Sequence, residues 1–156
     1  MKHAAAIAKH FREAHFGGNW SASSLKELLR DVSWQQATTK VDGFHDIATL
    51  VFHMNYYIAA VTKVLEGGPL EAHDKFSFDC PAIRSDDDWT RLTRKALADA
   101  ERFAALVEQI PDETLHENLD DPKYGTVYRN LHGIIEHCHY HFGQIAMLRK
   151  LTADSN

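Results

Sequence analysis

TVYRNLHGIIEHCHYHFGQIAMLRKL, residues 126–151, is the stretch that decides the fold class. Its apolar side chains recur at steps of three and four residues, which is the period of an amphipathic α-helix. They are Val127, Leu131, Ile134, Cys138, Ile145 and Leu148. The stretch is long enough for about seven helical turns. It therefore predicts one long helix with a single buried face.

Three upstream segments show the same period. The first covers residues 2–16, the second runs from residue 42 or 43 to the stop at Gly67-Gly68-Pro69, and the third covers residues 85–110. Four long helices with one apolar face each must bury those faces against one another. The sequence thus predicts an all-α four-helix bundle, formed as one domain by residues 1–156.

Shorter features lie between the first two long helices. Ser24-Leu25-Lys26-Glu27 has the form of a capping box and predicts a short helix there. Trp20 and Trp34 flank this short helix, and we expect both to lie against the main core.

The connection from Gly67 to Ser85 is too long for a tight helical hairpin. A crossover between the second and third long helices is therefore expected, so the bundle need not be simply up-down-up-down. Phe76 and Phe78 lie in this connection, where they are expected either to cover one end of the bundle or to form a small strand-like turn.

Composition narrows the range of partners. The chain of 156 residues has 17 Lys and Arg against 22 Asp and Glu, a net charge of −5, which argues against nucleic-acid binding. Cys80 and Cys138 make no disulfide framework, so the expected location is the reducing cytoplasm. The most apolar run, residues 47–52, is far shorter than the ~20 residues of a membrane span. No membrane partner is expected.

Histidine is over-represented, with 11 of 156 positions. His137 and His141 stand four residues apart on one flank of the last apolar stripe, and Cβ atoms at that spacing lie about 5–6 Å apart. Two such imidazoles can direct ring nitrogens at one ion. His53 occupies a similar flank of the second helix. The pattern leaves two interpretations open: a three-histidine metal site, or ordinary histidines beside the core.

Other polar side chains lie near these histidines. Gln144 and Asn130 share the flank of the pair, where either can fix a histidine tautomer or contact a ligand; Gln144 equally suits a hydrogen bond between helices. Tyr57 is a candidate proton donor, against the ordinary role of a tyrosine with a buried ring and a hydrated hydroxyl. The histidines of the first helix are expected to face solvent: His3, His10 and His15.

The run from His137 to Ile145 resembles the last-helix motif of the DinB/YfiT-like superfamily, which is a His, three residues, a second His, one residue and then Gly-Gln. His53, followed by Tyr56-Tyr57, resembles the family's helix-two histidine. The family's usual arginine between the second histidine and the glycine is Phe142 here, a departure that leaves the histidines untouched. The resemblance implies a bundle of non-standard connectivity, often homodimeric, with a divalent metal ion held by His53, His137 and His141.

An open three-histidine site supports two chemistries. A metal ion can lower the pKa of bound water, or it can bind a thiol as thiolate. The resemblance favours thiol-dependent S-transfer or addition to a small-molecule substrate, with a low-molecular-weight thiol as cosubstrate; metal-assisted hydrolysis is the second candidate. Imidazole ligands suit zinc or nickel, with iron or copper as alternatives. The alternative function is a non-catalytic or stress-associated dimeric bundle that binds metal, and no catalytic residue is assigned.

Overall fold

The structure is a computed structural model that describes residues 2–153. In this part of the chain it contains helices and no strand, as predicted. The helices are α1 (His3–Phe16), α2 (Leu25–Leu28), α3 (Trp34–Thr38), α4 (Ile47–Leu65), α5 (Asp74–Ser77), α6 (Asp86–Gln109), the 3-10 helices η1 (Asp112–His116) and η2 (Pro122–Tyr124), and α7 (Val127–Leu151). No helix of the described segment is both long enough and apolar enough to cross a bilayer.

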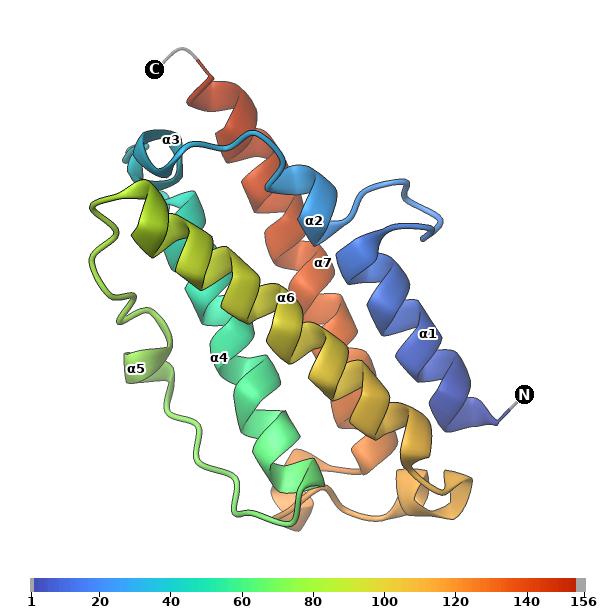
Figure 1. Cartoon of the computed structure of the whole chain (residues 1–156). Helices are drawn as coiled ribbons and strands as arrows, with labels where there is room; N and C mark the ends of the chain where they lie inside the picture. Colours follow the sequence, from blue (N-terminus) through green and yellow to red (C-terminus); the bar gives the residue numbers. More distant parts are fainter. Residues whose placement is uncertain (1, 154–156) are drawn as a thin grey trace.

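The four long helices are α1, α4, α6 and α7 (Figure 1). Helix α1 packs against α6 and α7, and α4 packs against the same two helices. The long helices α1 and α4, which follow one another in the bundle, therefore sit diagonally across it. In Figure 1, α1 and α7 run upward, whereas α4 and α6 run downward. Because α4 and α6 are parallel, residues 66–85 return along the whole bundle, which is consistent with the predicted crossover. We call residues 66–85 the crossover.

Side-chain caps set the helix starts. The Thr126 hydroxyl accepts a hydrogen bond from the Arg129 amide at 3.2 Å, and the Ser85 hydroxyl accepts one from the Asp88 amide at 3.2 Å. The predicted start of the second long helix near residue 42 or 43 is wrong. That helix, α4, begins at Ile47, because the Asp46 carboxylate accepts from the Thr49 amide at 2.8 Å.

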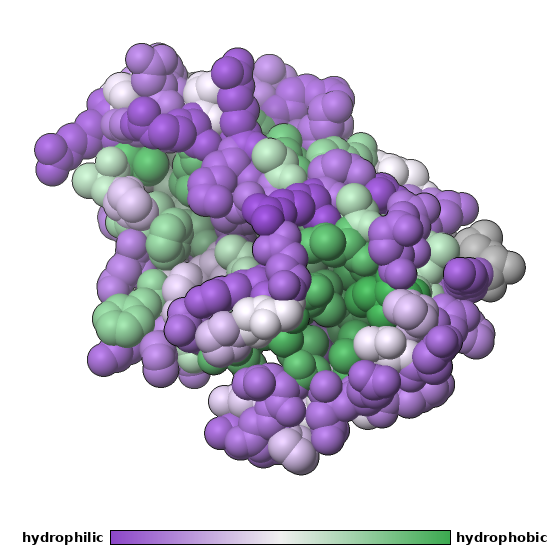
Figure 2. Space-filling model, turned by 60° about the horizontal axis from the view of Figure 1, so that its bottom comes forward, coloured by the Kyte–Doolittle hydropathy of each residue, from purple (hydrophilic) through white to green (hydrophobic). Residues whose placement is uncertain are grey.

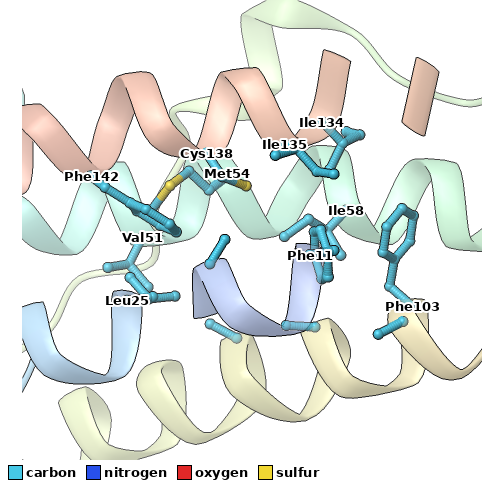
Figure 3. Packing of buried hydrophobic residues seen from close by; sticks show 14 of the residues in the cluster. Phe11, Leu25, Val51, Met54, Ile58, Phe103, Ile134, Ile135, Cys138 and Phe142 are labelled. Carbon is cyan, nitrogen blue, oxygen red and sulfur yellow. The ribbon is translucent and has the colours of Figure 1, made fainter. Parts of the chain in front are cut away.

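The core lies along the shared axis of the bundle (Figure 3). Phe11 of α1 packs against Phe103 of α6, with ring centroids 4.5 Å apart, and both rings are fully buried. Met54 of α4 and Cys138 and Phe142 of α7 are buried members of this core cluster (Figure 3). Phe142 is buried, so the position where the family usually has arginine is a core position in this chain.

Two expectations about the core are wrong. Trp20 is fully exposed rather than packed, because it lies in the turn after α1, whereas Trp34 packs against the core as expected. His15 is fully buried instead of facing solvent. It continues the apolar stripe of α1; its Nδ1 donates to the Phe11 carbonyl at 2.9 Å, and its Nε2 lies 3.9 Å from the Cys138 thiol.

Burial lowers the pKa of His15 to about 4 from its ordinary value of 6.5. As the pH falls below 6.5, His15 therefore becomes protonated in the unfolded chain before it does in the folded protein. Between pH 6.5 and pH 4, this one residue lowers the free energy of unfolding by up to about 1.4 kcal/mol for each pH unit. In His15→Gln, which keeps a donor to the Phe11 carbonyl, we expect this slope to be smaller by about 1 kcal/mol per pH unit. Urea denaturation of the metal-free protein between pH 4.5 and 7 measures it. His116→Gln is the matched control, because it removes a histidine from an exposed position. A pH slope in His15→Gln equal to that of the wild type would contradict the prediction.

Candidate metal site

Three histidines meet between α4 and α7. His53 is supplied by α4, and His137 and His141 by consecutive turns of α7. The Nε2 atom of His137 lies 3.0 Å from Nε2 of His53 and 3.0 Å from Nε2 of His141. The helices bring these rings together because α4 and α7 are direct neighbours in the bundle. We call the three residues the histidine cluster.

The histidine cluster is largely withdrawn from water. His53 and His141 are buried, and His137 is half-buried. Burial, followed by the neighbouring His141, lowers the pKa of both His53 and His137 to about 4. Burial also lowers the pKa of His141. The three imidazoles are therefore neutral at pH 7, which is the form that binds a metal ion.

Hydrogen bonds fix the tautomers of two of these rings. The Ser77 hydroxyl donates its proton to the Asp74 carbonyl at 2.8 Å, so it accepts from His53 Nδ1 at 3.0 Å. The Gln144 side-chain oxygen lies 2.6 Å from Nδ1 of His141 and accepts from it. With Nδ1 protonated, both rings present an unprotonated Nε2 to the centre of the cluster.

The donor set fits a divalent ion. Two lone pairs, from His53 and His141, converge on Nε2 of His137, which carries at most one proton to share between them. Two nitrogens bound to one ion at about 2.0–2.1 Å lie about 2.8–3.4 Å apart at angles of about 90–110°. The 3.0 Å separations are within this range. Among residues 2–153, no further histidine, cysteine, aspartate or glutamate joins the three imidazoles, so this ligand set leaves coordination positions open.

The crossover covers one face of the cluster. Phe78 stacks on His53 with ring centroids 3.9 Å apart and planes 8° from parallel. On its other face Phe78 stacks on His45, at 4.2 Å and 10°. The stack His45–Phe78–His53 shields the His53 ring, so Phe78 covers the cluster rather than forming a strand-like turn.

Two tyrosines of α4 tie the crossover to the bundle. The Tyr57 hydroxyl donates to the Asp74 carboxylate, and the Tyr56 hydroxyl accepts from the His73 amide at 2.8 Å. Burial, together with the bond to Asp74, raises the pKa of Tyr57. The Tyr57 ring stands edge-on to His137, with centroids 5.2 Å apart. Tyr57 thus lies beside the cluster, and its proton is engaged in holding the crossover.

A pocket of about 800 Å³ reaches the cluster at His137. Tyr57 and Asn130 line it as well. Asn130 forms no bond to a histidine; its amide donates to the carbonyls of Tyr124 and Thr126, at 3.0 and 2.8 Å. Its role is to hold the η2 loop at the pocket wall, whereas Gln144 contacts the cluster directly.

At the end of the molecule that carries η1 and η2, the surface has a hydrophobic hollow bordered by hydrophilic side chains (Figure 2).

The sequence did not predict the hydrogen bond of Ser77 to His53 or the stacking of Phe78 on His53 and His45. Ser77, Phe78 and His45 lie in connections, where side-chain direction follows from the path of the chain and not from a helical period. The length of the crossover was the available signal, because a segment that spans the bundle must pass along the surface of its helices.

A family model described as the DinB superfamily matches residues 19–145, a range that includes all three histidines. No curated protein and no solved structure matches the chain significantly.

Removing the ring of Phe78 is expected to loosen the crossover. Phe78→Ala deletes two aromatic stacks, each worth about 0.5–1.5 kcal/mol, so the amides of residues 69–84 should exchange about tenfold faster. Hydrogen exchange followed by mass spectrometry measures this, with α6 as the internal reference. Phe76→Ala is the matched control, because Phe76 is a neighbouring aromatic ring with no stack on the cluster. Equal effects of the two variants would contradict the role of Phe78.

Proposed function

The chain belongs to the DinB superfamily, and from this premise and the histidine cluster we propose that it is a metal-dependent enzyme. In this proposal His53, His137 and His141 hold one divalent ion, zinc or nickel in preference to iron or copper. Gln144 orients His141 and Ser77 orients His53, because each accepts a hydrogen bond from Nδ1 of that histidine.

The observation that carries the proposal is the pocket. An ion with a purely structural role is normally closed off by four protein ligands. Here three ligands converge, and one of them, His137, lines a pocket of about 800 Å³, which is large enough for a small molecule. This arrangement favours an enzyme over the non-catalytic, stress-associated bundle.

We favour thiol-dependent S-transfer or addition as the reaction. A bound divalent ion supplies Lewis acidity that stabilises a thiolate or a hydroxide. Hydrolysis by this type of site commonly uses a carboxylate as general base. Among the described residues, the carboxylate in the pocket lining is Asp74, which accepts the Tyr57 proton. A thiol ionises more readily than water, so it depends less on such a base.

The chain's own residues prepare the site for this reaction. Phe78 and the edge of Tyr57 limit the access of water to His53 and His137. The Tyr57 hydroxyl stays protonated at pH 7 and keeps the crossover closed over the cluster. The pocket side of His137 stays open for a small-molecule substrate. The homodimer and the cytoplasmic location expected from the sequence stay predictions.

Metal binding is the first test. The tag-free wild type is expected to bind one zinc ion per chain, and His137→Ala should weaken binding at least about 100-fold because a ligand is lost. Gln144→Leu should weaken it by about 10- to 100-fold, since His141 loses its acceptor. Calorimetry and metal analysis measure both. His132→Ala is the matched control on the same helix, and its ring packs on Tyr128 away from the cluster. Stoichiometric tight binding by His137→Ala would contradict the ligand assignment.

Thiol transfer is the second test. With zinc bound, the wild type should accelerate the reaction of glutathione, cysteine or coenzyme A with monochlorobimane. In this reaction the thiol sulfur bonds to carbon, chloride leaves and the thiol proton passes to solvent. His137→Ala should abolish the acceleration and His132→Ala should retain it. Turnover of esters or amides without thiol turnover would favour hydrolysis, and tight zinc binding without either reaction would favour the non-catalytic bundle.

A further inference from the structure

The cationic side chains that line the pocket point to a carboxylate-binding subsite. We propose that Lys75, Lys123 and Arg129 bind an anionic group at one end of a small molecule whose other end reaches the histidine cluster. The assignment of the reactive end rests on the proposed function, whereas the anion subsite stands on its own residues. The substrate class is then an elongated, partly apolar carboxylate.

The charges of the pocket oppose those of the whole chain. The chain carries a net charge of −5, yet the pocket lining contains three cationic side chains and one carboxylate, Asp74. That carboxylate accepts from the Tyr57 hydroxyl. A local excess of positive charge on an acidic protein raises the concentration of anions at the mouth of the pocket.

Two of the three cations have no acidic partner. Within residues 2–153, Lys75 and Arg129 form no ion pair; the Lys75 ammonium lies over the Phe76 ring, 4.5 Å from its centroid. Lys123 is paired with Asp121 at 3.3 Å, and both side chains are exposed. Lys75 belongs to the crossover and Arg129 to α7, so unpaired cations stand on two different elements of the pocket wall. A ligand carboxylate in this pocket would gain a charge-assisted hydrogen bond from either of these cations.

The backbone around Arg129 is built to hold its side chain. Gly125 has a φ of +80°, and a Cβ atom there would lie 2.9 Å from Cδ of Arg129. The absence of a side chain at Gly125 therefore lets the arginine stem fold over the loop. The Asn130 amide bonds to the Tyr124 and Thr126 carbonyls on either side of this glycine. This function of Asn130 fixes the loop that carries Lys123 as well.

Several lining residues of the pocket are apolar and suit the hydrocarbon part of a ligand. They include Ala60, Val61, Leu70, Leu119 and Ile134. Arg129 and His137 are eight residues apart on α7, a rise of about 12 Å along the helix. A ligand that joins the two sites therefore needs an apolar stem of several carbon atoms between its carboxylate and its reacting atom.

Binding of octanoate to the metal-free protein tests the subsite. Octanoate should bind more tightly than octanamide, which has the same chain without the charge, and its affinity should fall with added salt. Arg129→Gln and Lys75→Gln should each weaken octanoate binding by about five- to tenfold, and neither should change octanamide binding. Arg94→Gln is the matched control, because it removes the same charge from an exposed position on α6 outside the pocket. Calorimetry measures all of these affinities.

The outcomes separate the two proposals. Equal binding of octanoate and octanamide, or wild-type octanoate affinity in Arg129→Gln, would overturn the subsite whether or not zinc binds. Selective octanoate binding by a protein that fails to bind zinc would leave the subsite standing and sink the proposed enzyme. In the thiol reaction, octanoate should compete with either the thiol or the electrophile. The reactant with which it competes is the one whose carboxylate occupies the subsite. Competition with neither would overturn the link between this subsite and the reaction.

Discussion

The arrangement depends on one constraint: three neutral imidazoles are held with their Nε2 atoms pointing at one another. Nε2 of His137 is 3.0 Å from that of His53 and from that of His141. Lone pairs that converge in a buried place are unfavourable unless a cation or a proton lies between them. Burial keeps the rings uncharged, with the pKa of His53 and His137 lowered to about 4. The site is therefore poised to bind a cation, and the energy that holds it in this form comes from the surrounding bundle.

The chain's connectivity explains how the site is enclosed. Because α4 and α6 are parallel, the crossover must return the length of the bundle, and it passes beside the α4–α7 groove where the cluster lies (Figure 1). One short run of this crossover supplies the acceptor for His53, its stacking partner and the acceptor for Tyr57: Ser77, Phe78 and Asp74. An up-down-up-down bundle would need no such segment. The topology and the chemistry of the site are thus connected through this crossover.

Helical periodicity predicted the all-α fold and placed His137 and His141 on one flank, and the length of the Gly67–Ser85 connection predicted the crossover. The pattern left a three-histidine site open as one of two interpretations, and the family resemblance implied the full set with His53. Gln144 was also expected near the pair, since it stands three residues after His141 on the same helix. The pattern did not predict the roles of Ser77, Phe78 and His45, whose directions depend on loops. His15 was wrongly expected in solvent because a polar residue at the end of an apolar stripe was given the usual exposure of its type, whereas its two ring nitrogens are engaged inside the core.

The positions of the imidazole protons decide whether the histidine cluster can bind a cation. Side-chain ¹⁵N NMR of histidines in the metal-free protein at pH 7 observes this directly. We expect His53 and His141 to carry their proton on Nδ1, and one equivalent of zinc to shift the Nε2 resonances of His53, His137 and His141 together. Protonated Nε2 atoms on His53 and His141, with resonances that zinc leaves in place, would contradict it.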